Sequence, residues 1–541
     1  MKKKLLPALI VTGLIILVVI IMGITALINK YTPTKKTEDL KEYFNISSDD
    51  EAALIVDNEL SDYKAKIIDK KIYVDYKFVH DSLNSRFYWD ANENVLLYTT
   101  ASDIISAAAD SNSYSVTKQT NDFGYPIVKA TSDSALIALD YVKQYSKITF
   151  KSYDDPARIV ITSKWDEIDS ATVSKSTQVR VKGGIKSPIL KEVKKDDKIT
   201  ILDSGDKWDK IATEDGVIGY IKGKALSESK KTKLTNPDYE EETFTHIKKD
   251  KDICLAWNQV TSQSANSKVP QVISSTKGIN VMSPTWFYLN DNNGNLADIA
   301  SKDYVSYCHS QGIEVWGLFS NFENTDVDAA YVLTHTSTRT TLINQIMSAA
   351  FNYELDGVNI DFENITEAAY GDSYIEFIRE LAIKCHNNGI SLSVDVTVPA
   401  SFNKFFNRSD MAKFADYIVI MGYDEHYKGS DAGSVSSIPW VTEGVESTLK
   451  EVPADQIILG MPFYTRIWEL TPKEDDDAVT DTEDQSKYTV ASQVYSMDAA
   501  AAQLATNNAT AALDEQSGQN YAEWSASTKL YKVWLEDSKS L

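Results

Sequence analysis

The second half of the chain alternates short apolar runs with amphipathic stretches, and no other feature constrains the fold as strongly. Apolar strands separated by helices predict a parallel sheet covered by helices. Seven units in sequence order predict an α/β fold, a (β/α)8 TIM barrel over residues 251–541, with its site at the carboxyl ends of the strands. The seven apolar runs are 252–257, 279–284, 313–319, 356–362, 390–398, 416–423 and 456–463.

The end of this region departs from the pattern. After Phe463 the sequence offers no second apolar strand followed by a helix, so we expect the eighth strand to be missing and the chain to be C-terminally incomplete. Residues 469–531 look instead like an inserted excursion with a helix at about 498–506. One intervening helix is predicted to begin with a capping box, Ser373 and Glu376, and to end at Gly389.

The run DGVNIDFE, residues 356–363, places polar side chains in a strand that otherwise looks buried. Side chains alternate across a strand, so Asn359, Asp361 and Glu363 share one face and the apolar residues between them share the other. The Cα atoms of Asp361 and Glu363 are expected about 6.6 Å apart. Two carboxyls this close separate in pKa, and the one that keeps its proton near neutrality can act as a general acid.

This run is similar to the D-G-x-D-x-D-x-E signature of glycoside hydrolase family 18. Further on, DYIVIMGYDEH, residues 416–426, looks like the M-x-Y-D motif of that family's sixth strand. The resemblance covers roughly residues 250–541. The wording DGVNIDFEN more closely resembles the branch that contains spore-cortex and cell-wall N-acetylglucosaminidases than it resembles the chitin digesters.

The resemblance implies a role for each matching residue. Glu363 would protonate the glycosidic oxygen and then activate water, while Asp361 would orient the substrate's own N-acetyl group. The acetamido oxygen would attack the anomeric carbon in place of an enzyme nucleophile, so configuration would be retained. Tyr423 would hydrogen-bond the acetamido group, and Met421 and Asp424 would shape the pocket.

Asp356 and Asn359, two further positions of the signature, are expected to serve substrate binding. Asp356 fits the first position, and Gly357 removes a side chain where the barrel interior is crowded. Asn359 stands where the signature more often has Asp. An amide takes up no proton and carries no charge, so any part that the usual Asp plays in tuning Asp361 must change.

Aromatic residues near the predicted strand ends could stack on sugar rings. The alternative is that they belong to the core, as stripes of aromatic residues more often do. The candidates are Trp257, Trp286, Tyr288, Tyr464 and Trp468.

Composition excludes several other kinds of site. The formal charge of −23 argues against nucleic-acid binding, which needs clustered Lys and Arg. The three cysteines, Cys254, Cys308 and Cys385, are widely spaced and are expected in the core. The six histidines lack metal-ligand spacing, so we expect neither a metal nor a cofactor.

The N-terminus carries basic residues at 2–4 and then an uncharged apolar run, Leu5 to Ile28. Roughly 20 helical residues cross the hydrocarbon core of a membrane, so residues 1–30 predict a cytoplasmic tip and a single-pass anchor with the rest of the chain outside the cell. The alternative is the signal peptide of a secreted protein, although its apolar region is normally shorter, about 7 to 15 residues.

Between the anchor and the barrel, residues 40–165 and 175–228 read as two small β-rich accessory modules. Within the first, 71–100 and 134–162 share a strand, a short helix and two more strands, and the first copy resembles the copper amine oxidase N-terminal domain. That copy offers only His80, so no copper is implied.

The second module resembles bacterial Src-homology-3-like domains, which implies binding to cell-wall peptide or packing beside a catalytic domain. Trp208 and Tyr220 could form an aromatic ligand face or belong to the core and rim of a tiny barrel. Residues 229–250 are charged and read as a linker.

The sequence therefore predicts a retaining glycoside hydrolase, anchored in the cell membrane, that cleaves β-1,4 linkages after N-acetylglucosamine in peptidoglycan. Two alternatives remain open, a chitinase and a catalytically silent protein that binds cell-wall carbohydrate. The expected partners are the N-acetylglucosamine polymer, the bacterial cell wall and the membrane, but not nucleic acid.

Overall fold

The computed structural model describes residues 5–236, 238–363, 365, 370–473 and 484–538. The chain divides into two compact units, each described by itself. The first unit comprises 1–89, 107–115 and 120–241, and the second comprises 90–106, 116–119 and 242–541. The second unit thus takes part of the predicted accessory module 40–165 together with the predicted barrel.

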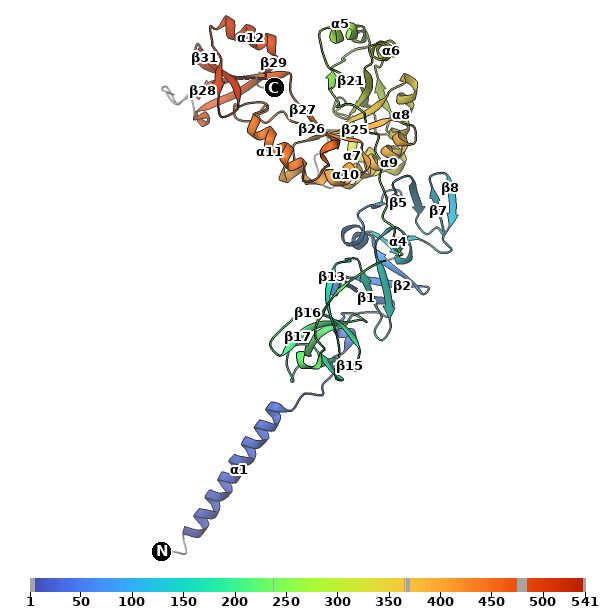
Figure 1. Cartoon of the computed structure of the whole chain (residues 1–541), viewed down its shortest axis with the longest axis vertical. Coiled ribbons are helices and arrows are strands. Elements are labelled where there is room, and N and C mark those ends of the chain that lie inside the picture. The colour runs from blue at the N-terminus through green and yellow to red at the C-terminus, as the bar shows by residue number, and fades with distance from the viewer. Residues whose placement is uncertain (1–4, 237, 364, 366–369, 474–483, 539–541) are drawn as a thin grey trace. The chain divides into compact units, whose positions relative to one another are not determined.

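The first unit begins with the predicted apolar helix, α1 (Leu5–Tyr31), drawn in blue in Figure 1. Its segment Leu9–Tyr31 has a mean hydropathy of 2.9, and its side chains are exposed. By length and composition this helix could cross a membrane, and an N-terminal signal sequence would have the same properties.

A seven-stranded sheet in the order β11-β12-β1-β2-β3-β10-β9 follows. The two predicted repeats have the expected element order, because a strand, a short helix and two strands succeed one another in 71–100 and again in 134–162. The seven strands of this sheet are β1 (Glu51–Val56), β2 (Glu59–Ile68), β3 (Lys71–Asp75), β9 (Val128–Ala130), β10 (Ala135–Ala138), β11 (Thr149–Tyr153) and β12 (Arg158–Thr162). A separate five-stranded sheet has the order β4 (Phe87–Asp90), β5 (Val95–Thr99), β6 (Ile104–Ala108), β7 (Ser113–Val116) and β8 (Gln119–Asp122). The short helices are α2 (Leu40–Tyr43), α3 (Tyr76–Phe78) and α4 (Leu139–Tyr145).

A second sheet of short antiparallel strands forms from residues 167–233, in the order β15-β14-β18-β17-β16-β13-β19. The predicted linker is partly wrong, because its residues 230–233 form β19 and pair with β13. Here the side chains of a charged segment face solvent while its backbone completes the sheet. The strands are β13 (Glu167–Thr172), β14 (Thr177–Arg180), β15 (Ile189–Val193), β16 (Lys198–Asp203), β17 (Trp208–Thr213), β18 (Ile218–Lys222) and β19 (Lys230–Lys233).

The second unit contains all seven predicted strands in one parallel sheet, in sequence order β20-β21-β23-β24-β25-β26-β27. Within the described residues the path runs from β20 to β27 without closing, so the expected closed barrel is present only in part. The strands are β20 (Leu255–Asn258), β21 (Val281–Leu289), β23 (Glu314–Ser320), β24 (Gly357–Asp361), β25 (Ser391–Thr397), β26 (Tyr417–Met421) and β27 (Ile457–Gly460), and β22 (Leu296–Asp298) pairs antiparallel with β21.

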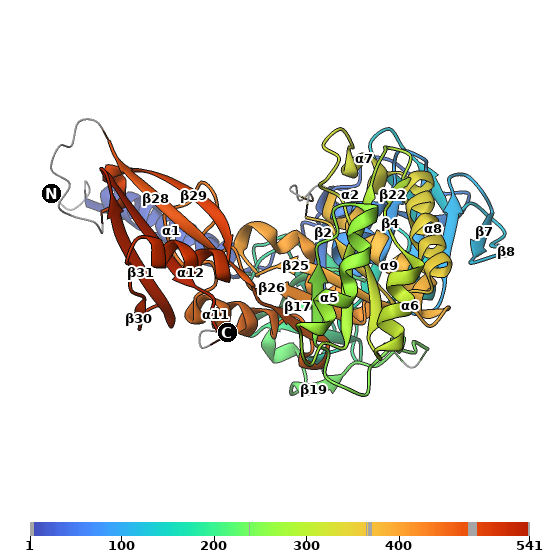
Figure 2. The same cartoon turned by 90° about the horizontal axis from the view of Figure 1, so that it is seen from above.

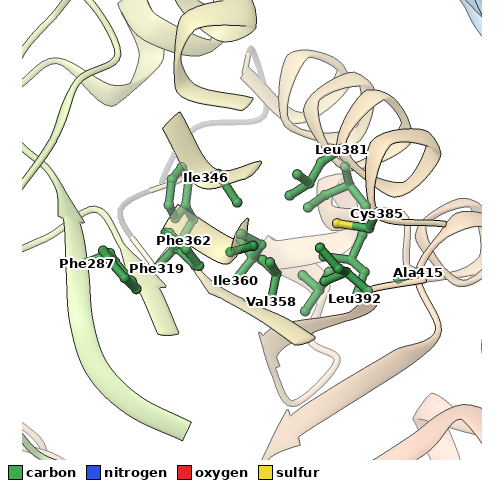
Figure 3. Close-up of a cluster of buried hydrophobic side chains, with 14 of the residues drawn as sticks. Phe287, Phe319, Ile346, Val358, Ile360, Phe362, Leu381, Cys385, Leu392 and Ala415 are labelled. Carbon is green, nitrogen blue, oxygen red and sulfur yellow. The ribbon is translucent and has the colours of Figure 1, made fainter. Parts of the chain in front are cut away.

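Helices cover the outer face of this sheet (Figures 1 and 2). The apolar face of β24, with Val358 and Ile360, packs with Phe362 against Leu381 and Cys385 of α9, as Figure 3 shows. The expected packing of these residues under the helices is therefore confirmed. The helices are α5 (Val269–Ser274), α6 (Lys302–Ser310), α7 (Ala329–Thr334), α8 (Thr336–Tyr353), α9 (Gly371–His386), α10 (Arg408–Phe414) and α11 (Ile438–Thr448).

Helix α9 does not begin with the predicted capping box. Its N-cap is Tyr370, and Ser373 and Glu376 lie inside the helix. The Glu376 carboxylate instead accepts a hydrogen bond from Arg379 at 3.0 Å and another from Thr99 at 2.8 Å. A buried ion pair within the helix and a long-range hydrogen bond from Thr99 thus take the side chain that local sequence assigns to a cap.

A turn of the accessory segment caps α8. The Asp90 carboxylate accepts hydrogen bonds of 2.6 Å from both the backbone N–H and the hydroxyl of Thr336, and Glu93 accepts one of 3.0 Å from the backbone N–H of Ser337. Acidic groups at a helix N-terminus accept hydrogen bonds from its free N–H groups and interact favourably with the positive end of the helix dipole. Residues 90–106 are therefore fixed to the helical layer of the second unit.

The expected excursion is an antiparallel five-stranded sheet in the order β29-β28-β32-β31-β30, with the predicted helix present as α12 (Met497–Thr506). In both views this sheet lies beside α11 and away from α6 and α8 (Figures 1 and 2). Its strands are β28 (Tyr464–Pro472), β29 (Tyr488–Ser496), β30 (Ala512–Asp514), β31 (Gln519–Ala526) and β32 (Lys529–Leu535).

Gly357 is required at the start of β24. A Cβ there would lie 2.6 Å from the Trp316 indole, which is buried and tethered to Glu314 by a hydrogen bond of 2.9 Å. We expect Gly357→Ala to lower the stability of this unit by about 1–3 kcal/mol through overpacking. Calorimetry measures the change, and Gly184→Ala, where a Cβ meets nothing within 4 Å, is the control. An unchanged Tm in both variants would contradict this expectation.

Candidate active site

The interior face of β24 carries the polar residues of the run 356–363 towards the carboxyl ends of the strands. Asn359 is fully buried, Asp361 ends the strand, and Glu363 follows two residues later and is exposed. This placement follows from alternation along the strand, since the same three positions share one face.

Asn359 connects three other strands through hydrogen bonds. Its side-chain oxygen accepts from Trp257 Nε1 at 3.0 Å and from Ser283 Oγ at 2.9 Å, and its amide nitrogen donates to Asp395 Oδ1 at 2.7 Å. Trp257 lies on β20, which is three places from β24 in the sheet order. A bond between such distant strands requires a sheet that curves around its interior.

Asp361 is a half-buried carboxyl whose Oδ1 has no hydrogen-bond partner among the residues that the structure describes. Burial raises its pKa well above the ordinary value, and the nearby carboxyls of Asp395, Glu363 and Glu323 raise it further. A free acceptor of this kind is suited to an N–H donor on a ligand.

Glu363 meets the electrostatic requirement for a general acid. Although the residue is open to solvent on one side, the surrounding protein desolvates its carboxyl and raises the pKa above that of an ordinary glutamate, and Asp424 and Glu323 add to the shift because like charges oppose its ionisation. A carboxyl that keeps its proton towards neutrality can donate that proton to a leaving group.

Tyr423 follows β26 and lies between two aromatic rings. Its ring makes edge contacts with Trp257 and with Tyr464, at centroid distances of 6.2 Å and 6.1 Å. Burial raises the pKa of the Tyr423 hydroxyl far above its ordinary value, with Asp395 and Asp361 the next contributors. This hydroxyl remains protonated and can donate a hydrogen bond.

Asp424 has a left-handed backbone, with φ of 60°. Its Oδ1 accepts hydrogen bonds from the Tyr464 hydroxyl at 2.8 Å and from Arg466 at 3.1 Å. Both partners lie on β28, so the loop after β26 is held against the antiparallel sheet. Met421, at the end of β26, is buried beside this loop.

An apolar cavity of about 610 Å³ lies next to these residues, between β20 and β27. Trp257, Tyr423 and Tyr464 form part of its lining, together with Leu459 and Phe463. Phe463 is 76% exposed, so an apolar surface leads from solvent to the aromatic residues of the site.

Three predicted substrate-binding residues are corrected by the structure. Asp356 precedes β24, at the opposite end of the strand from Glu363, and its Oδ2 accepts hydrogen bonds from Val315 N and His309 Nε2, both at 2.8 Å. Trp286 and Trp468 are buried in separate cores. Their indole N–H groups bond to Asn266 and to the Gly433 carbonyl, each at 2.8 Å, so neither ring faces a ligand.

Some of the remaining aromatic and cysteine residues lie where the sequence predicts, and others do not. Trp257 and Tyr464 lie at the site, while Tyr288 is half-buried on β21. Cys308 and Cys385 are in the core as expected, but Cys254 is exposed, so the expectation for it is wrong. Across the described ranges, no cluster of His, Cys, Asp and Glu suited to a metal ion is found.

Sequence analysis missed Asp395, Ser283 and Glu323. Asp395 is the one charged residue in the apolar run 390–398, which is the same local signal that singled out 356–363. Ser283 belongs to the predicted strand 279–284, and Glu323 follows β23 and accepts a hydrogen bond of 2.6 Å from Ser320. No sequence signal distinguishes these last two from ordinary polar residues.

Residues 309–541 match the family model described as Glycosyl hydrolases family 18. The cortical fragment-lytic enzyme of Bacillus subtilis (strain 168) is 24% identical over 259 residues, which is 46% of this chain and 57% of that protein. The uncharacterized glycosylase YvbX of the same organism is 25% identical over 194 residues, 33% of this chain and 55% of YvbX. The chain thus spans little more than half the length of these relatives.

Among solved structures, the chain is similar to the Bacillus cereus spore cortex-lytic enzyme SleL. The identity is 19% and the TM-score 0.45, and the match covers 53% of this chain and 65% of that one.

Proposed function

Because the chain carries a glycosyl hydrolase family 18 domain, we propose that it is a retaining glycoside hydrolase that cleaves β-1,4 linkages after N-acetylglucosamine in cell-wall glycan. One observation carries the proposal. At the carboxyl end of β24, a carboxyl with raised pKa, Glu363, lies beside Asp361, whose Oδ1 has no hydrogen-bond partner within the described part of the chain.

In the proposed reaction, Glu363 donates its proton to the glycosidic oxygen as the bond to the anomeric carbon breaks. The carbonyl oxygen of the substrate's acetamido group attacks that carbon, Asp361 accepts a hydrogen bond from the acetamido N–H, and the Tyr423 hydroxyl donates one to the same group. Glu363, now ionised, takes a proton from a water molecule. The oxygen of that water attacks the anomeric carbon from the face that the leaving group vacated, and the bond between this carbon and the acetamido oxygen breaks. Two inversions at one carbon give retention.

Three observations favour peptidoglycan as the substrate. The helix α1 is long and apolar enough to anchor the chain in a membrane with the hydrolase domain outside, where cell-wall glycan lies. Several β-sheets lie between this helix and the hydrolase domain in the sequence, and we propose that they bind the wall, as their predicted resemblance to cell-surface modules implies. The cortical fragment-lytic enzyme, by its name, acts on spore cortex. Chitin is the alternative polymer, because it carries the same N-acetyl group.

The second candidate function is a wall-binding protein without turnover. It is favoured by Asn359, which occupies a buried position beside the two carboxyls and takes up no proton.

Product analysis tests the proposal. We expect the full chain in detergent micelles to release fragments with N-acetylglucosamine at the reducing end from purified peptidoglycan, as seen by mass spectrometry. Proton NMR of a chito-oligosaccharide digest should show the β-anomer first, because the reaction retains configuration. The α-anomer appearing first, or N-acetylmuramic acid at the new ends, would contradict the mechanism or the bond. Binding without new ends on either polymer would favour the second candidate.

A further inference from the structure

The proposed reaction does not by itself use Asp395. This buried carboxyl nevertheless accepts a hydrogen bond from Asn359, the residue that departs from the family signature. We propose that Asp395 is a positioning residue: it supplies from β25 the ionisable carboxyl that position 359 lacks, and it shares one proton with Asp361. The part of Asp395 in turnover rests on the proposed function, whereas the shared proton can be tested without any substrate.

The strand register brings the two carboxyls together. Strands β24 and β25 are parallel, with Asn359 opposite Ser393 and Ile360 opposite Val394. The next positions along the two strands are Asp361 and Asp395. Alternation places both side chains on the interior face, the face that also carries Asn359.

The orientation of the Asn359 amide is fixed by its other partners. Trp257 Nε1 and Ser283 Oγ both donate to its oxygen, so the amide nitrogen must face Asp395, to which it donates at 2.7 Å. Asp395 Oδ1 is therefore an acceptor, and a proton held by Asp395 lies on its other oxygen. A second carboxyl at position 359 could not donate in this way while ionised.

Burial prevents both carboxyls from ionising near neutrality. Asp395 is 3% exposed, and burial raises its pKa to about 8, although the hydrogen bond from Asn359 opposes the shift. The pKa of Asp361 is raised by burial and by Asp395. The pair then holds one proton between two sites. The titratable groups that interact with Asp395 are Asp361, Glu363, Tyr374 and Tyr423.

This shared proton has a consequence for the acetamido group. When Asp395 holds the proton, Asp361 is ionised and accepts the acetamido N–H strongly, which stabilises the positive charge that develops on that group during attack. When Asp361 holds the proton, this stabilisation is lost. The proton only moves between the two carboxyls, so the step leaves the net charge unchanged.

The first test compares the Tm of the wild-type chain and of Asp395→Asn, both full length in detergent, from pH 4 to pH 8. An acid whose folded pKa exceeds its unfolded value stabilises the fold fully below the unfolded pKa, near 4, and loses that contribution as pH rises towards the folded value, about 8. Wild type should therefore lose at least about 3 °C relative to the variant across this range. A Tm difference that does not change with pH would overturn the shared proton.

The second test is the pH profile of kcat/KM on the glycan that wild type cleaves. Without the neighbouring carboxyl, Asp361 ionises more easily, so Asp395→Asn should move the acidic limb of this profile at least about one pH unit lower. The exchange variant N359D/D395N restores a carboxyl pair and should return the limb most of the way to its wild-type position. An unmoved limb, or no recovery, would overturn the positioning role.

Asp416→Asn is the matched control. Asp416 is as buried as Asp395, at 2% exposed, but it precedes β26 and binds the backbone N–H of Leu392 at 2.8 Å, away from the site. Its loss should lower Tm without moving the acidic limb. A wild-type chain that cleaves no glycan would refute the proposed function, and the Tm comparison would still decide whether Asp395 holds the proton.

Discussion

Glu363→Gln is expected to reduce kcat on N-acetylglucosamine polymers by about a thousandfold and to leave glycan binding intact. Glutamine has the shape of glutamate but carries no transferable proton, and loss of a general acid typically costs about 10²–10⁴ in rate. Glu363 is exposed, so its replacement leaves the core unchanged. Mass spectrometry of released fragments measures the rate, and calorimetric titration with a chito-oligosaccharide measures binding.

The control for this variant is Glu443→Gln, an exposed position on α11. It makes the same chemical change and should retain activity within about twofold, as a surface substitution does. A Glu363→Gln variant that keeps more than a tenth of wild-type activity would move the general acid to another carboxyl. The candidates are then Glu323 and Asp424, the two groups whose charges raise the pKa of Glu363.

The sequence predicts those parts of the structure that local patterns determine. All seven strands are present because each is an apolar run bounded by turns, and Asn359, Asp361 and Glu363 share a face because side chains alternate along any strand. The helix at 497–506 is likewise a local property of an alanine-rich stretch.

Residue roles that depend on tertiary contacts could not be predicted in this way. Trp286 and Trp468 follow the same pattern as Trp257, and only the packing of other segments buries the first two. The Asp395–Asn359 bond joins positions 36 apart, which meet only through the register of β24 with β25. Glu376 has the spacing of a cap, but α9 begins two residues before Ser373, so Glu376 lies inside the helix, where it accepts a hydrogen bond from Thr99 and pairs with a buried arginine.

The second prediction with a large expected effect concerns this arginine, Arg379. Arg379 on α9 is 3% exposed and binds Glu376 Oε2 at 3.0 Å and Asp410 Oδ2, through Nε, at 3.1 Å. We expect Arg379→Met to lower the stability of the second unit by about 3–5 kcal/mol at pH 7, because it leaves the buried Glu376 carboxyl without its counter-charge and leaves Asp410 paired only with the exposed Lys413, at 3.3 Å. Calorimetry of the full chain in detergent measures the loss as a fall in Tm.

The pH dependence separates this charge effect from a loss of packing. Burial opposes the ionisation of Asp410, but Arg379 and Lys413 outweigh it and hold its pKa below the ordinary value. A lowered folded pKa contributes stability above the unfolded pKa and loses it as pH falls. The destabilisation by Arg379→Met should therefore shrink towards pH 4, where Asp410, deprived of Arg379, takes up a proton.

The triple variant R379M/E376Q/D410N completes the argument, since it removes the arginine and both charges together. It should recover at least half of the Tm lost in Arg379→Met, because amides are far less costly to bury than unpaired carboxylates. Equal Tm values for the single and triple variants, at pH 4 and at pH 7 alike, would show that the arginine acts by filling space. Recovery in the triple variant would assign the role to charge, and electrostatics would then hold α9 against α10 while its apolar face packs over β24.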